Sequence, residues 1–277
     1  MKSSARILGD APDRSYAAKL ELFSRFAAPE FCQIFSDLAL PSRGMVLDLG
    51  CGTGLTTSLL AEALGPDVGL VGLDLSLPHL QAARHQHVLP LVQADAEQLC
   101  FREGVFDCIW SCNTINHTAK SVDVLRSLKR HLRINGRLVL AQSGFLPEMF
   151  FAWDSHFDDA VRTACHQYYR ERYGLQLDDT KKLRSIVGLL HAADFDDVNV
   201  RTYVVERVQP LSQADRDYFQ RAVFEGLWGE KIRPFLGSAD LGKLDRYCDP
   251  NSSDYWLERT DFHHIQTITV CEGRIPA

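Results

Sequence analysis

The sequence predicts an α/β protein built on a doubly wound, mostly parallel β-sheet. Short apolar runs alternate with amphipathic segments over residues 45–142, as expected where each strand is followed by a crossover helix. In addition, three glycines within five positions follow the first apolar run, in the stretch Val46–Gly54, "VLDLGCGTG". Glycines at this place indicate a sharp turn from a strand into a helix, with backbone N–H groups that can face a ligand.

A helical leader is expected over residues 1–44. Apolar residues recur near helical spacing between Tyr16 and Leu40, with an interruption at Pro29. The alternating core follows this leader. Its expected strands are 45–49, 68–73, 89–93, 106–111 and 137–142, and its expected helices are 56–63, 78–85 and 122–132.

The alternation stops beyond Gly144. Residues 145–173 contain eight aromatic residues, well above the 10% of the whole chain, and apolar positions recur at helical spacing from Phe157 to Tyr168. We interpret this segment as an inserted cap helix. The core pattern then resumes with a helix at 181–193 and a strand in which Val198, Val200, Thr202 and Val204 alternate with polar residues, and a similar strand ends the chain.

A second cap is expected between these last two strands, because residues 209–261 form too long a connection for a hairpin loop. We therefore divide the chain into six segments. They are a leader (1–44), a ligand-binding core (45–144), a first cap (145–180), a continuation of the core (181–208), a second cap (209–261) and a last core strand (262–277).

Composition narrows the range of partners. The 277 residues carry a net charge of −6, which does not favour nucleic acid or an anionic membrane as a partner. No long apolar run predicts a membrane span, and no secretory signal is recognised at the start, so a cytoplasmic protein is expected. The eight cysteines include no CxxC pair, and Cys108 and Cys112 lack a second ligand pair, so we expect reduced thiols and no metal site.

Polar residues at the ends of the next strands indicate an adenosine ligand. Asp74 lies 24 residues after Gly50, where a carboxylate accepts hydrogen bonds from ribose hydroxyls. Asp95 and Ala96 follow the third strand, where an adenine edge could be recognised, and the fourth strand leads into an Asn-rich segment at Asn113. The glycine spacing is GxGxG, in contrast to the GxGxxG of dinucleotide-binding folds.

Over about residues 40–145 the chain resembles the class I S-adenosylmethionine-dependent methyltransferases of the small-molecule type. The resemblance implies a Rossmann-like sheet, mostly parallel with an antiparallel last strand, helical cap insertions and S-adenosylmethionine as cofactor. It also implies roles for individual residues. These are Asp48, Gly50, Cys51, Gly52 and Gly54 around the methionine part, Asp74 at the ribose, Leu75, Asp95 and Ala96 at the adenine, Asn113 beside the sulfonium and Tyr16 as an aromatic that closes over the cofactor.

Methyl transfer from a sulfonium is an in-line displacement, so the enzyme contributes mainly proximity, alignment and desolvation. A general base is needed only when the acceptor arrives protonated, and His117 is the leading candidate. The family often has paired histidines where this chain has Asn116 and His117. Further candidates for a base are His156, His166, His263 and His264.

The expected acceptor is a small organic molecule. Methylases of nucleobase amines carry an Asn/Asp-Pro-Pro-aromatic run after the fourth strand, whereas this chain reads Asn113-Thr114-Ile115-Asn116. Two aromatic insertions at the carboxyl edge of the sheet predict an enclosed apolar pocket, with Phe150, Trp153 and Tyr173 as acceptor-binding residues. We expect transfer to O or N in natural-product or cofactor metabolism. The alternatives are a protein or tRNA methyltransferase and a non-catalytic protein that binds an adenosine ligand.

Overall fold

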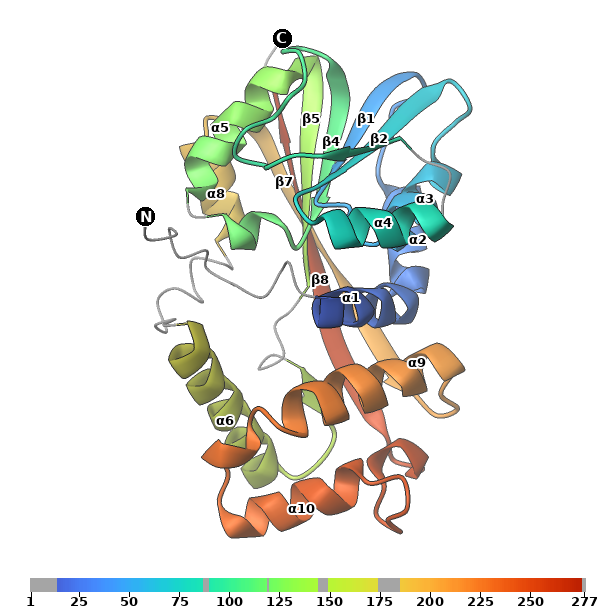
Figure 1. Ribbon diagram of the computed structural model, residues 1–277, viewed down its shortest axis with the longest axis vertical. Helices are drawn as coiled ribbons and strands as arrows, with labels where there is room; N and C mark the ends of the chain where they lie inside the picture. The colour runs from blue at the N-terminus through green and yellow to red at the C-terminus, as the bar shows by residue number, and fades with distance from the viewer. Residues whose placement is uncertain (1–13, 87–89, 119, 144–148, 174–184, 276–277) are drawn as a thin grey trace.

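The structure is a computed structural model that describes residues 14–86, 90–118, 120–143, 149–173 and 185–275. Its centre is one eight-stranded sheet in the order β3-β2-β1-β4-β5-β8-β6, with β7 paired to β8 along its other edge (Figure 1). The strands are β1 Gly44–Leu49, β2 Val68–Asp74, β3 Leu91–Gln93, β4 Phe106–Cys112, β5 Leu132–Ser143, β6 Phe150–Phe151, β7 Asp196–Val208 and β8 His263–Arg274.

The first five strands are parallel, and β8 runs antiparallel to β5, β6 and β7. The predicted fold class is therefore confirmed. The helices are α1 Arg14–Phe26, α2 Ala28–Asp37, α3 Leu55–Ala63, α4 Leu77–Gln86, α5 Ser121–His131, α6 Ser155–Tyr173, α8 Ile186–Ala192, α9 Gln213–Asp217 and α10 Ser238–Cys248. Short 3-10 helices are η1 Ile115–His117, η4 Arg233–Phe235 and η5 Trp256–Glu258. Among the described residues, Tyr218–Trp228 form the π-helix η3.

The two faces of the sheet are buried in separate hydrophobic clusters. Val46 of β1 belongs to the cluster that contains α2 and α3 residues, and its neighbour Leu47 belongs to the cluster formed with α5 and α8. Successive strand residues point to opposite faces, so a strand covered on both sides reads as a continuous apolar run. This explains why the sequence locates β1, β2 and β4 to within about two residues.

Strands β7 and β8 extend from the sheet into a second lobe that contains α6, η3 and α10 (Figure 1). Aromatic side chains of both expected caps form the core of this lobe. The Trp153 ring stacks on Phe151 at 4.7 Å and contacts Phe157, Trp228 and Trp256 at 4.9–5.4 Å. The aromatic enrichment therefore reflects, to a large extent, the packing of the lobe itself.

Several boundaries differ from the sequence prediction for local reasons. The leader helix breaks at Ala27, and Pro29 lies in the first turn of α2, where its missing N–H costs nothing. Strand β5 begins at Leu132, ahead of the turn at Asn135, whose φ is 64°. The helix expected over 181–193 is described from Ile186, and residues 181–184 lie outside the described residues.

All eight cysteines are free thiols. The described residues include no group of three or more His, Cys, Asp or Glu side chains that could hold a metal ion. Within the same ranges, no helix has both the length and the apolar character of a membrane span.

Candidate functional site

A pocket opens at the carboxyl ends of β1, β2, β3 and β4, beneath α1. This edge of a doubly wound sheet is where such folds bind ligands, since the strand order reverses there. Its lining residues are Leu20, Gly50, Gly52, Leu73, Asp74, Leu75, Ser76, His79, Ala94, Asp95, Ala96, Glu97, Cys112, Asn113, Thr114, His117 and Thr118.

The glycine loop after β1 has a conformation that side chains would not allow. Gly50, Gly52 and Gly54 have φ angles of 77°, 55° and 83°, all in the left-handed region. A Cβ atom at Gly50 would lie 1.9 Å from Thr114 Oγ1, and one at Gly52 would project into the pocket, 3.5 Å from Leu20 Cδ1. The loop thus leaves space at the pocket, and Gly54 is the N-cap of α3.

Asp74 connects this loop to the end of β2. Its Oδ2 accepts the N–H of Gly52 at 2.9 Å, and its Oδ1 accepts the N–H of Ser76 at 2.8 Å. His79 Nδ1 lies 3.5 Å from the same Oδ1. Each carboxylate oxygen has a second acceptor position, so Asp74 can accept further hydrogen bonds from a ligand in the pocket.

Asp48 lies under the loop and is buried. Its Oδ2 accepts the Thr57 hydroxyl at 2.6 Å. The pKa of Asp48 is raised to about 7, mainly because of burial; the Thr57 hydrogen bond lowers it, and the nearby Asp74 carboxylate makes a smaller contribution that raises it. Asp48 is therefore near the midpoint of its titration at neutral pH. Burial also raises the pKa of the Cys51 thiol, which excludes a thiolate there.

The residues after β3 form a turn. The Asp95 side chain accepts the N–H of Glu97 at 3.0 Å, and the N–H of Gln98 donates to the Asp95 carbonyl at 2.9 Å. Asp95, Ala96 and the exposed Leu75 all line the pocket. The structure therefore places the three residues predicted for the adenine around one pocket.

Amide side chains join the ends of β4 and β5. Asn113 has a φ of 54°, and its Oδ1 accepts the backbone N–H and the hydroxyl of Ser143 at 2.9 and 3.1 Å. Asn116 is buried, and its Nδ2 donates to Gln142 Oε1. At the position where the resembled family often has a histidine, this chain thus has Asn116, and its pairing with Gln142 holds η1 in place. His117 is the last residue of η1 and lines the pocket.

Some predicted residues are not brought to this pocket among the described side chains. Trp153 donates its indole N–H to Asp158 at 3.0 Å inside the second lobe, and the exposed Phe150 lies on β6. Tyr16 and Tyr173 fall within α1 and α6, but their side chains lie outside the described residues. The acceptor-binding role of Phe150, Trp153 and Tyr173 stays a prediction.

Leu20 and His79 are among the pocket residues that were not predicted from the sequence. Leu20 reaches the glycine loop from α1, one helical turn after Tyr16. His79 is 3% exposed and lies in the first turn of α4 behind Asp74. A single leucine or histidine on a helix has no sequence signal of its own, although both follow from the topology once α1 and α4 are placed beside the loop.

Residues 47–140 match the family model described as a methyltransferase domain. This segment, about a third of the chain, is similar to a methyltransferase domain. It runs from within β1 to within β5 and includes the glycine loop, Asp74 and the Asp95 turn, which are polar parts of the pocket.

Curated relatives resemble the methyltransferase domain over part of their length. A malonyl-(acyl-carrier protein) O-methyltransferase of Legionella pneumophila is 34% identical over 116 residues, which are 40% of this chain and 40% of the relative. A ubiquinone/menaquinone biosynthesis C-methyltransferase UbiE of Pseudomonas savastanoi is 29% identical over 140 residues, 46% of this chain and 55% of the relative. The chain thus spans about half the length, or less, of these relatives.

Solved structures of similar fold extend beyond the methyltransferase domain. The Haemonchus contortus phosphoethanolamine N-methyltransferase 2 in complex with S-adenosyl-L-methionine has a TM-score of 0.57 at 17% identity, and the match covers 100% of this chain and 61% of that one. The YcgJ protein of Bacillus subtilis has a TM-score of 0.52 at 14% identity, covering 90% of this chain and 99% of the other. At these identities the likeness shows the fold alone.

Proposed function

We propose that the protein is an S-adenosylmethionine-dependent methyltransferase that transfers a methyl group to O or N of a small organic acceptor. The observation that carries the proposal is the loop of three left-handed glycines, joined to the strand-end carboxylate of Asp74 by the Gly52 N–H. The residues suit this cofactor, because Gly52 adds no side chain of its own to the pocket and Asp74 keeps acceptor positions for ribose hydroxyls.

The chain's own residues would bind and align the reactants. When bound, S-adenosylmethionine supplies a methyl group on a sulfonium, which is already an excellent leaving group. Asp74 would hold the ribose, Asp95 and Ala96 the adenine, and Leu20 and Leu75 would exclude water. His117 would accept a proton only where the acceptor arrives protonated.

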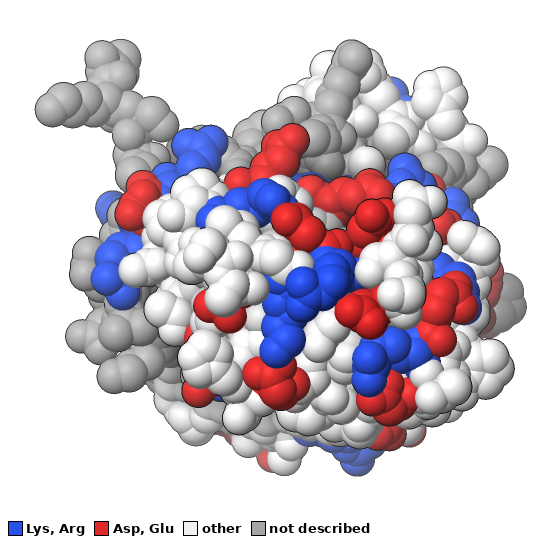
Figure 2. All heavy atoms as spheres, turned by 90° about the horizontal axis from the view of Figure 1, so that it is seen from below, with Lys and Arg blue, Asp and Glu red and all other residues white. Residues whose placement is uncertain are grey.

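We further propose that the acceptor belongs to cytoplasmic natural-product or cofactor metabolism. A small acceptor, in contrast to a nucleic acid, is favoured by the net charge of −6 and by the absence of a Pro-Pro run after Asn113. Acidic and basic side chains also lie intermixed on the face drawn in Figure 2. We keep the division into leader, core and caps as part of this proposal. Labelled S-adenosylmethionine incubated with a metabolite pool should yield a labelled small molecule. Label in protein or tRNA would favour a protein or tRNA methyltransferase. Cofactor binding without methyl transfer to any of these acceptors would favour a non-catalytic protein that binds an adenosine ligand.

The cofactor assignment predicts a ligand preference. The protein should bind S-adenosylmethionine and S-adenosylhomocysteine and should not bind NAD, because the GxGxG loop and the Asp95 turn suit one adenosine. Isothermal titration calorimetry with each ligand measures this preference. Tight NAD binding without a response to S-adenosylmethionine would refute it.

The raised pKa of Asp48 predicts a pH-dependent affinity. A cationic sulfonium favours the ionised carboxylate, so binding should release a proton below about pH 7, and affinity should rise between about pH 6 and pH 8. Calorimetry across this range measures the change, and S-adenosylhomocysteine, which lacks the sulfonium charge, should show less of it. His79 and His117 also line the pocket, so Asp48→Asn isolates the effect. A wild-type slope that persists in Asp48→Asn would assign it to another group.

A further inference from the structure

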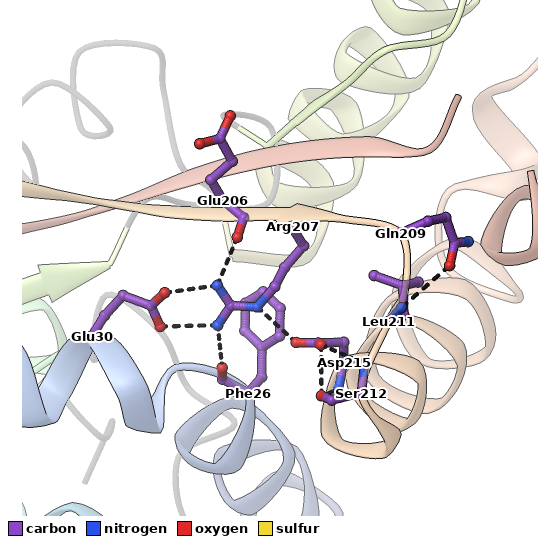
Figure 3. Close-up of polar contacts among 8 residues, drawn as sticks. All are labelled: Phe26, Glu30, Glu206, Arg207, Gln209, Leu211, Ser212 and Asp215. Carbon is purple, nitrogen blue, oxygen red and sulfur yellow. Dashed lines mark hydrogen bonds and ion pairs between the residues drawn. The ribbon is translucent and has the colours of Figure 1, made fainter. Parts of the chain in front are cut away.

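One arginine joins the leader, the sheet and the second lobe (Figure 3). Arg207 lies near the end of β7, and its guanidinium donates to both carboxylate oxygens of Glu30 at 2.7 and 2.9 Å and to Asp215 Oδ1 at 2.7 Å. These three side chains are only 13%, 12% and 10% exposed. Charged groups withdrawn from water to this degree remain stable only when they are well paired.

The remaining N–H groups of Arg207 bind backbone carbonyls. Nη2 donates to the carbonyl of Phe26 at 2.6 Å, and Nη1 donates to that of Glu206 at 2.8 Å. Phe26 is the last residue of α1, where a positive charge complements the carbonyl end of the helix, and its ring lies 4.6 Å from the guanidinium carbon. All five donors of the guanidinium are therefore used, and several of them act at the junction of α1 and α2.

The partners of Arg207 are fixed in turn. Asp215 forms a capping box with Ser212 at the start of α9, accepting the Ser212 N–H at 2.9 Å. The Phe26 ring stacks on Tyr218 of η3 at 4.2 Å. The end of α1 is thus held by β7 and by the first turns of the second lobe.

The middle of α1 reaches the cofactor pocket. Leu20 lines this pocket and precedes Phe26 by six residues, about 9 Å along a helix. Lys19 packs against the π-helix at Gly226, where an added Cβ would lie 3.3 Å from Lys19 Cε. Helix α1 therefore contacts the glycine loop on one side and the second lobe on the other, as its place between the two lobes in Figure 1 shows.

We propose that Arg207 is a positioning residue for the cofactor site, which holds the end of α1 and thereby places Leu20 over the glycine loop. Through this helix, the order of the second lobe is coupled to cofactor affinity. The identity of the ligand in this inference rests on the proposed function. The contacts by which Arg207 holds α1 are independent of it.

The test uses Arg207→Lys, which keeps the charge but loses the bidentate pair and most of the carbonyl contacts. Glu30→Gln is a second, milder variant of the same contact. The matched control is Arg137→Lys, because Arg137 is also buried, with 7% of its side chain exposed, and pairs with Glu272 at 3.0 Å. It donates to the Ala39 carbonyl as well, and neither partner lies on α1. Hydrogen exchange of the α1 amides, S-adenosylhomocysteine affinity by calorimetry and urea unfolding are measured for each.

In Arg207→Lys and Glu30→Gln, we expect faster exchange in α1 and an S-adenosylhomocysteine affinity weaker by about tenfold, a typical size for coupling between sites. Arg137→Lys should lose stability and keep both properties. Unchanged α1 exchange in both test variants would overturn the proposal, as would loosened α1 with wild-type affinity. A wild-type protein that binds no adenosyl ligand would overturn the proposed function instead, and the exchange result would still decide whether Arg207 orders α1.

Discussion

Replacement of Gly50 by alanine should destabilise the fold by about 3 kcal/mol or more and eliminate adenosyl-ligand binding. The first cause is the backbone, because a φ of 77° is unfavourable for any residue with a Cβ. The second is space, because the new Cβ would lie 1.9 Å from Thr114 Oγ1 and 2.6 Å from its Cγ2. Thr114 is held by its own hydrogen bond to the Cys112 carbonyl at 3.1 Å, so its retreat would disturb the turn after β4.

Gly104→Ala provides the matched control for Gly50→Ala. Gly104 has a φ of 65°, but no heavy atom lies within 4 Å of a Cβ built there. This variant should therefore lose only the backbone contribution, about 1–2 kcal/mol, and should keep ligand binding. Urea unfolding of both variants gives the two costs. An equal loss of unfolding free energy in the two variants would show that the contact with Thr114 does not restrict the side chain at position 50.

The sequence located the parts of the fold that depend on short-range patterns. Val46 and Leu47 face opposite clusters, so the run in β1 is apolar throughout and easily recognised. The glycine loop follows β1, and Asp74 is the last residue of β2. Because β1 and β2 are parallel neighbours, the loop and the carboxylate lie at the same edge of the sheet and line one pocket. The antiparallel pairing of β8 with β5 is confirmed in the same sheet.

The features that the sequence did not provide depend on contacts between distant segments. Residues 215–227 have helical periodicity, but nothing in them distinguishes the π-helix η3 from an α-helix. Aromatic enrichment at Trp153 indicates burial without indicating the partner, and the structure places Trp153 against Phe151 and Trp228. Arg207 and Glu30 are separated by 177 positions, so their pairing has no local signal.

Asp74→Ala should weaken S-adenosylmethionine binding by about 2 kcal/mol or more. The proposed cause is the loss of the acceptor for two ribose hydroxyls, which would remain buried without partners. The structure adds a second cause, because Asp74 also accepts the N–H groups of Gly52 and Ser76 and thereby holds the glycine loop against β2. Some loss of stability, about 1–3 kcal/mol, should accompany the loss of affinity.

A matched control separates these two causes. Asp107 in β4 is also a partly buried carboxylate, and it accepts the backbone N–H of Met45 in the neighbouring β1 at 2.8 Å. It lies at the amino end of β4, whereas the pocket lies at the carboxyl ends of the strands. Asp107→Ala should therefore lose comparable stability and keep its affinity for S-adenosylmethionine. Calorimetry and urea unfolding of both variants provide the comparison. If Asp74→Ala folds and binds the cofactor as tightly as Asp107→Ala does, then Asp74 does not hold the ribose, and the polar groups at Asp95 would have to supply the specificity for adenosine.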